Sequence, residues 1–363
     1  MMKIAFPIMG TSYIAFQKIM EKLGHEAIVP PKPSKRTLSL GVTYSPEFAC
    51  LPFKILLGSY LEAIERGADT IVSYGGVGPC RAGYYGVMHE KIIRDLGYDV
   101  KFIIFEPPHR EFKKCMAAGK ELVNAKENSW GKIFEALTTG WVHLRALDEI
   151  ERLSHEIRPY EINKGDTTKA FKQCLELMKQ ADTKKQIAEA KRESVKILKN
   201  VEVDPTRNPL KIGLIGEIYV VIEPFANFDI QVTLGEMGVL TRRNIYITDW
   251  TKDNTFFKGE EHIKRAARPY LNQMIGGHGI ISVGQTVLYA KEGYDGVVQL
   301  APFSCIPEIV AKGILPKVSK DLDIPVMTVF LDEQTGKAGL QTRLEAFIDL
   351  LKAKRDSLRE ETA

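Results

Sequence analysis

The chain has 363 residues, of which 44% are hydrophobic and 26% charged, and these fractions are typical of a soluble globular protein. This length exceeds that of a single hydrophobic core, so we expect two or more packed units. A net charge of only +4, without a dense Lys/Arg stripe, argues against nucleic acid as a partner. No run of about 18 apolar residues occurs, so we expect neither a transmembrane helix nor a membrane partner.

The first third of the chain alternates β-rich apolar runs with amphipathic stretches. The amino-terminal run lacks a signal-peptide cleavage site and is interpreted as the first strand. Pro52 suits the first turn of a helix, and Gly67 suits its C-terminal stop. Such alternation is typical of a parallel sheet covered by helices. The patterns predict strands at 3–9, 25–31, 68–76 and 98–108, and helices at 13–24, 51–67 and 84–97.

The middle of the chain changes character and then the alternation returns. Residues 109–208 are rich in Lys, Glu, Ala and Leu, with apolar residues at helical spacing, and predict a helical insert. The predicted fold is therefore α/β, with two Rossmann-like parallel-sheet lobes at 1–108 and 209–363 and the insert between them. In the second lobe we expect a first strand from 211, helices at 228–238, 278–293, 306–321 and 340–359, and strands at 239–249, 293–301 and 324–332.

A weak internal repeat connects the two lobes. Residues 65–72 lead to Cys80, and residues 291–298 lead to Cys305. Both segments have the pattern helix end, Gly stop, Asp, apolar strand, proline-containing loop and cysteine. Open α/β sheets bind ligands at the carboxyl ends of their strands, so the two lobes are expected to aim these cysteines at a common cleft.

Cys50, Cys80 and Cys305 share a setting in which proline lies close by and a helix follows. The positive N-terminal end of each helix favours thiolate, and Lys54 and Arg81 add positive charge. Three such thiols suggest one shared metal site, and the alternative is a set of unrelated buried thiols.

The other two cysteines, Cys115 and Cys174, lie at helical spacing with apolar neighbours and are interpreted as core residues. Five cysteines are an odd number for a disulfide framework, which favours reduced thiols in the cytoplasm.

The cysteine spacing narrows the choice of metal. Paired cysteines typical of structural zinc are absent, as is the bacterial ferredoxin run. Three widely separated thiolates can hold a 4Fe–4S cluster and leave one iron without a cysteine ligand. Such an iron can bind water, hydroxyl or a substrate oxygen, which favours chemistry over simple electron conduction.

Five motifs make the chain resemble the 2-hydroxyacyl-CoA dehydratase superfamily, in its branch of acyl-CoA dehydratase activase-related and double-cubane cluster proteins. The resemblance covers both lobes and implies Rossmann-like sheets around an iron–sulfur cluster held by Cys50, Cys80 and Cys305. It also implies a separate ATP-dependent activator, carrying its own cluster, that injects a low-potential electron. The motifs are ACLPFK (49–54), GGVGPCRAGYYG (75–86), GEIYV (216–220), APFSCIPE (301–308) and EQTGKAGLQTRLEAFIDL (333–350).

The resemblance implies a dehydratase-like lyase or a reductase subunit acting on an acyl-CoA or another small molecule, as a homodimer or heterodimer. One alternative is an electron relay without its own substrate, and another is a metal-free two-lobed binding protein. A double-cubane 8Fe–9S cluster would need about twice as many thiolates, so one 4Fe–4S cluster is favoured. The chain contains no G-x-x-x-x-G-K-[ST] sequence, so the ATP site is expected in the activator.

Other residues carry two interpretations each. Glu217 is interpreted either as a general acid or base, or as a carboxylate that stabilises a helix N-terminus. Glu308 is interpreted either as a contact to the cluster or substrate, or as a cap of its own helix. His278, in a glycine turn, is a candidate for donating to a substrate oxygen or ligating iron, or for capping the next helix. Gly78 lies in a glycine run that either cradles a phosphate or lets the backbone approach the cluster beside Arg81.

Overall fold

The computed structural model describes residues 1–363 except 77–78, 108–110, 124–128, 250, 252–258 and 363. The chain divides into two compact units, each assembled from three segments. Unit 1 comprises Met1–Glu149, Leu175–Arg192 and Ile247–Lys258, and unit 2 comprises Ile150–Cys174, Glu193–Tyr246 and Gly259–Ala363.

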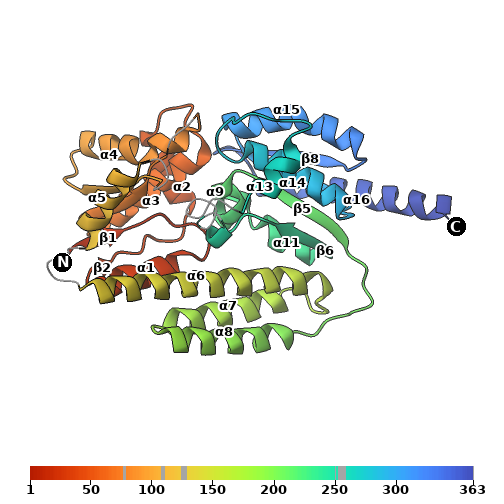
Figure 1. The fold of residues 1–363 in the computed structure, drawn as a ribbon. Coiled ribbons are helices and arrows are strands. Elements are labelled where there is room, and N and C mark those ends of the chain that lie inside the picture. Colours follow the sequence, from red (N-terminus) through yellow and green to blue (C-terminus); the bar gives the residue numbers. More distant parts are fainter. Residues whose placement is uncertain (77–78, 108–110, 124–128, 250, 252–258, 363) are drawn as a thin grey trace. The chain divides into compact units, whose positions relative to one another are not determined.

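Unit 1 contains a four-stranded parallel sheet in the order β2-β1-β3-β4, of which β1 and β2 are labelled in Figure 1. Its strands are β1 (Lys3–Ala5), β2 (Glu26–Ala27), β3 (Thr70–Tyr74) and β4 (Lys101–Phe105). Parallel strands need crossover connections, and helices provide them here: α1 (Tyr13–Lys22), α2 (Lys35–Tyr44), α3 (Leu51–Glu65), η1 (Arg81–Tyr84) and α4 (Tyr85–Asp95). Helix α5 (Phe112–Val123) follows the last strand of the sheet.

Unit 2 contains a second parallel sheet with the equivalent order, β6-β5-β7-β8. Its strands are β5 (Leu210–Gly216), β6 (Val239–Arg243), β7 (Gly296–Pro302) and β8 (Val326–Leu331). Every residue of β7 is buried, as expected for a central parallel strand covered on both faces. The helices are α9 (Ile218–Ile222), α10 (Pro224–Asn227), α11 (Ile230–Glu236), α13 (Glu261–Ala267), α14 (Gly279–Lys291), α15 (Ile306–Asp321) and α16 (Lys337–Thr362).

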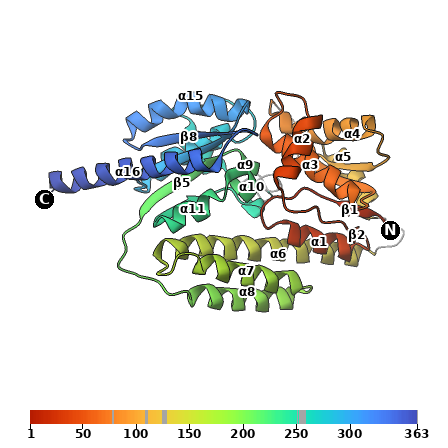
Figure 2. The ribbon, with the colours of Figure 1, turned by 180° about the vertical axis from the view of Figure 1, so that it is seen from behind.

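The closing helix α16 packs on the sheet of unit 2 (Figure 2). A Cβ atom at Gly296, the first residue of β7, would lie 2.9 Å from the Leu351 side chain of this helix. The glycine therefore permits close contact between helix and strand.

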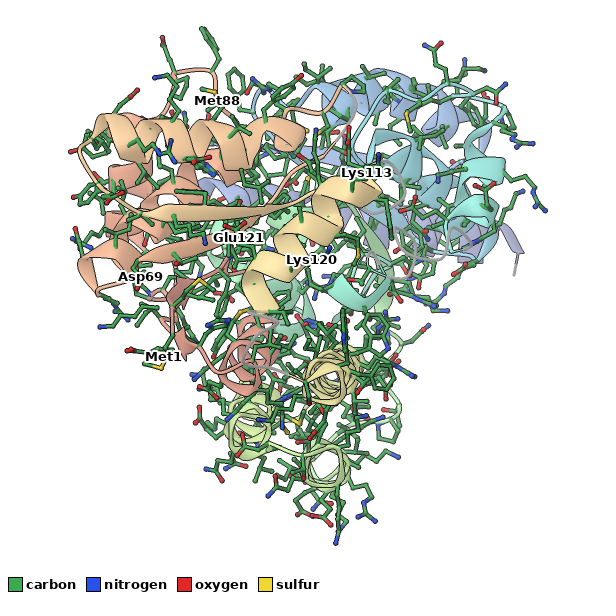
Figure 3. The ribbon with its side chains drawn as sticks, turned by 60° about the vertical axis from the view of Figure 1, so that its left-hand side comes forward. Met1, Asp69, Met88, Lys113, Lys120 and Glu121 are labelled. Atoms are coloured by element: carbon green, nitrogen blue, oxygen red, sulfur yellow. The ribbon has the colours of Figure 1, made fainter. Side chains whose placement is uncertain are left out.

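The segment 109–208, predicted to form a helical insert, is helical in the structure. After α5 it contains α6 (Trp130–Ile157), η2 (Arg158–Tyr160), α7 (Asp166–Gln180) and α8 (Lys184–Lys199). Figures 1 and 3 show α6, α7 and α8 running side by side, in Figure 3 nearly end-on. The three long helices α6, α7 and α8 contribute residues to both compact units. Among the described residues, no helix is both long and apolar enough to cross a membrane.

The two parallel sheets confirm the predicted α/β class, but the sequence prediction missed helices α2, α9, α10 and α13 and extended several strands too far. Helix α2 was not predicted, although Ser34 and Thr37 form a capping box at its start; α13 was not predicted either. The strand predicted at 239–249 ends at Arg243. Beyond it the chain enters unit 1, where the Thr248 amide donates to the Asp148 carboxylate at 3.1 Å instead of extending the sheet.

The strand order defines where each unit can bind a ligand. In both sheets the chain adds a strand on one side of the first strand and then crosses to the other side. The carboxyl ends of β1 and β3, and of β5 and β7, therefore meet at a topological switch point, where open α/β sheets bind ligands.

Candidate functional site

Cys50 caps the N-terminus of α3 with an extended backbone conformation, and Pro52 lies in the first helical turn. Proline fits here because the first-turn amides have no partner within the helix. The thiol is buried and lies 2.5 Å from the hydroxyl of Tyr85 on α4. Cys50 is therefore held against the helix that follows β3.

Cys80 follows β3 and caps η1, also with an extended backbone. Its loop is held by a close glycine contact, because a Cβ atom at Gly83 would lie 2.5 Å from the Gly76 carbonyl oxygen. Arg81 donates to the Phe48 carbonyl at 2.7 Å and so connects the loop of Cys80 to the loop of Cys50. Gly78, predicted to approach the cofactor, lies outside the described residues.

A pocket of about 240 Å³ opens beside Cys50 and Arg81 in unit 1. Its lining is mainly apolar, so it suits an apolar group better than a charged one. The lining residues are Pro46, Phe48, Ala49, Cys50, Phe53, Arg81, Tyr84, Tyr85 and Met88.

In unit 2, Cys305 follows β7 and caps α15. The residue before it, Ser304, has φ of 66°, a left-handed conformation that is unfavourable for a residue with a side chain. Such strain clusters at functional sites, where the surrounding structure maintains it. Here it sharply turns the chain between the strand and the buried thiol.

Glu308 lies one turn after Cys305 and is completely buried. Its carboxyl group accepts hydrogen bonds from Ser282 Oγ at 2.9 Å and from Gln299 Nε2 at 2.8 Å, rather than capping its own helix. Thr328 Oγ1 donates to Gln299 Oε1 at 2.8 Å and fixes that amide in turn. Burial raises the pKa of Glu308 to about 7, while the two hydrogen bonds act in the opposite direction and Glu217 adds repulsion.

Glu217 caps the short helix α9 at the carboxyl end of β5 and accepts from the Val220 amide at 3.1 Å. The capping interpretation is thus confirmed, and the acid–base interpretation is compatible with it. Burial raises the pKa of Glu217 to about 7. Gly216, with φ of 140°, makes this position possible, because a Cβ atom there would lie 2.0 Å from the Leu300 carbonyl oxygen.

His278 caps α14 after two glycines with positive φ, Gly276 and Gly277. Its side chain makes no capping hydrogen bond, which removes the interpretation as a side-chain cap. Burial lowers the pKa of His278, with the Glu260 carboxylate acting in the opposite direction. The ring is therefore neutral at physiological pH and keeps a lone pair for a ligand.

The remaining cysteines differ from these three. Cys174 is fully buried, and its thiol donates to the Ser194 carbonyl at 3.5 Å, in agreement with a core role. Cys115 is half-buried on α5, and burial raises its pKa. No described cysteine forms a disulfide.

The structure assigns Cys50 and Cys80 to unit 1 and Glu217, His278, Cys305 and Glu308 to unit 2. Within the described ranges, no group of three or more His, Cys, Asp or Glu side chains is arranged to hold a metal ion. Cysteine sulfur is the donor that iron–sulfur clusters use, and each of the three thiols lies at the N-terminal, positive end of a helix.

Sequence reasoning missed Tyr85, Ser282 and Gln299. Gln299 could have been identified from the sequence, because a polar residue in the middle of a fully buried strand needs a hydrogen-bond partner. The other two give no such signal, because their contacts form only in the folded chain. No protein-family model matches this chain, and no curated protein matches it either.

Proposed function

We propose that this chain holds an iron–sulfur cluster through Cys50, Cys80 and Cys305 and uses it for low-potential single-electron chemistry on a small molecule or acyl-CoA. One observation carries the proposal. Cys80 and Cys305 open the helices after β3 and β7, which occupy the same place in two sheets of equivalent strand order. Packing alone does not require thiols at equivalent turns, whereas a shared ligand role does.

A cluster of this kind supplies single electrons and, at an iron with an open position, a Lewis acid. The motif resemblance to the 2-hydroxyacyl-CoA dehydratases supports this chemistry and implies a separate ATP-dependent activator as the electron source. An odd number of cysteines, five spread over a long chain, favours a reducing compartment, so we infer a cytoplasmic location.

Glu308 and Glu217 supply the acid–base part of the proposal. With pKa values of about 7, each carboxyl can hold or release a proton near neutral pH. Glu308 is fixed in orientation by Ser282 and Gln299, one turn after Cys305. We assign to these two carboxyls the proton that a leaving hydroxyl group needs to depart as water.

The pocket beside Cys50 supplies the apolar part of a substrate site. Phe48, Phe53 and Met88 line it together with Arg81, whose guanidinium donates to the Phe48 carbonyl. The apolar chain of an acyl group matches this lining.

Anaerobic purification tests the proposal directly. We expect a brown protein with about four iron and four sulfide ions per chain and an electron paramagnetic resonance signal after reduction. A colourless protein without iron or sulfide, even after anaerobic reconstitution, would refute the proposal.

The same preparation separates an enzyme from an electron relay. A candidate acyl-CoA added to the reduced protein should perturb the resonance signal if the cluster meets a substrate. A signal that no acyl-CoA or small-molecule candidate changes would favour the relay.

A further inference from the structure

The pocket of unit 1 is lined largely by aromatic rings. Of its nine lining residues, four are aromatic: Phe48, Phe53, Tyr84 and Tyr85. Met88 of α4, labelled in Figure 3, adds a thioether, and thioethers make favourable contacts with aromatic rings. All nine residues belong to unit 1, so the pocket is formed within a single compact unit.

Phe53 and Tyr85 form a wall of the pocket that is in place before any ligand binds. Their rings meet edge to face, with centroids 5.2 Å apart. The His89 ring packs against both, with its centroid 4.1 Å from that of Phe53 and 5.7 Å from that of Tyr85. The Tyr85 hydroxyl lies 2.5 Å from the Cys50 thiol, and all three rings are buried. A preformed wall lowers the ordering cost of binding.

Other lining side chains are exposed to water. Phe48 and Tyr84 are 68% and 67% exposed, and Met88 is 38% exposed. Large apolar side chains that gather in water around a pocket are typical of a ligand-binding surface. A ligand that covers them removes apolar area from water, which stabilises the complex.

The chemistry of the lining favours an uncharged ligand. The Arg81 guanidinium donates to the Phe48 carbonyl at 2.7 Å, within the protein itself. The rest of the lining is mainly apolar, so a charged group in the pocket would lose its hydration without full compensation.

The volume of the pocket sets the size of the ligand. An apolar cavity of about 150 Å³ holds benzene, so at the same occupancy a pocket of about 240 Å³ holds roughly ten carbon atoms. Two fused rings, or one ring with a short chain, have this size.

Aromatic lining also distinguishes a ring from a saturated chain. A contact between two aromatic rings adds roughly a twofold to tenfold gain in affinity beyond the burial of area. A saturated chain buries a similar area without this gain, and it loses more conformational freedom on binding.

We propose that this pocket binds an uncharged aromatic group of roughly ten carbon atoms, and that the apolar part of the substrate is such a group. As a statement about the substrate, the inference rests on the proposed function. The binding itself involves only side chains of unit 1 and needs no cluster.

Titration of the full-length protein with 2-naphthol, followed by the fluorescence of this probe, tests the inference. We expect saturable binding at one site per chain. Decahydro-2-naphthol has the same carbon skeleton without aromatic rings, and it is measured by its displacement of 2-naphthol. It should bind roughly twofold to tenfold more weakly. The anion 2-naphthoate should also bind more weakly than 2-naphthol, because it carries a charge into an apolar pocket.

A pair of variants locates the site and separates ring contact from burial. Tyr84→Leu keeps an apolar side chain at an exposed position but removes the ring, so it leaves the buried core intact. It should weaken 2-naphthol binding roughly twofold to tenfold and leave decahydro-2-naphthol binding unchanged. Tyr98→Leu is the matched control, because Tyr98 is an exposed tyrosine of unit 1 outside the pocket lining, and it should change neither affinity.

The outcomes of this experiment are distinct from those of the iron measurement. Absence of saturable 2-naphthol binding, equal affinity for the two probes, or equal effects of Tyr84→Leu and Tyr98→Leu would each overturn the inference and leave the proposed cluster standing. Specific 2-naphthol binding by a chain that cannot be loaded with iron would support the aromatic site and refute only the cluster.

Discussion

Glu308 illustrates at the residue scale how burial creates chemistry. A carboxyl group that is completely buried costs free energy when it ionises, and the hydrogen bonds from Ser282 and Gln299 offset only part of that cost. The group therefore stays protonated to about pH 7 instead of its usual 4.5.

Glu308→Gln should change the pH dependence of stability. In the wild type, the folded chain binds this proton more tightly than the unfolded chain, so stability falls as the pH rises from about 4.5 to about 7. Glutamine cannot ionise, so the variant should gain about 1–3 kcal/mol relative to wild type between pH 5 and pH 8. Urea unfolding at both pH values measures this gain.

The matched control is Glu345→Gln, at an exposed position of α16, where no such gain is expected. A Glu308→Gln difference that is the same at pH 5 and pH 8 would contradict a raised pKa for Glu308.

The three cysteines and Glu308 could be singled out from the sequence because each lies at or near the start of a helix with a recognisable proline or glycine pattern, after a strand for Cys80, Cys305 and Glu308 and after α2 for Cys50. The partners of these residues could not. Ser282 and Tyr85 reach Glu308 and Cys50 across gaps of 26 and 35 residues. Only tertiary packing decides such pairs, so local pattern carries no information about them.

At the scale of elements, the strand-to-helix turns depend on backbone conformations that few residues can adopt. Gly216 ends β5 with φ of 140° and packs on Leu300 of β7. This contact fixes where Glu217 begins α9.

Gly216→Ala should therefore destabilise the protein by at least about 2 kcal/mol, because the new Cβ atom would clash with the Leu300 carbonyl group in a strained backbone. Gly313→Ala is the control. Gly313 lies inside α15 with open space around it, so alanine there should stabilise by about 0.5–1 kcal/mol. Chemical unfolding of both variants measures the contrast, and equal effects would contradict the strained-turn account.

Element prediction succeeded where the apolar pattern was strong and failed where packing overrode it. The buried run of β7 and the amphipathic helix α15 were found near their observed bounds. Helix α2 was missed because its identity depends on tertiary contact: Gly41 approaches the Lys54 carbonyl of α3 so closely that a Cβ atom would lie 1.8 Å away. A sequence window of ten residues contains no sign of that contact.

At the scale of the whole molecule, the two units have sheets of equivalent strand order, and each has a cysteine at the turn after its third strand. A cofactor that binds the native chain suppresses local unfolding around the residues that hold it. If Cys50 and Cys305 both hold the cluster, loading should slow amide hydrogen exchange at the starts of α3 and α15 together.

Hydrogen-exchange mass spectrometry of loaded and chelator-treated protein checks this expectation. Helix α8, which carries none of the proposed ligands, serves as the internal control and should not change. Protection confined to one unit would contradict a shared cluster.

The central proposal is that Cys50, Cys80 and Cys305 hold an iron–sulfur cluster. Iron and acid-labile sulfide, measured in anaerobically purified cysteine variants, test it most directly. Cys50→Ala, Cys80→Ala and Cys305→Ala should each lose most of the iron, whereas Cys115→Ala, on α5 away from the capping positions, should keep it. Full iron content in any of the first three variants, or equal loss in Cys115→Ala, would contradict the account.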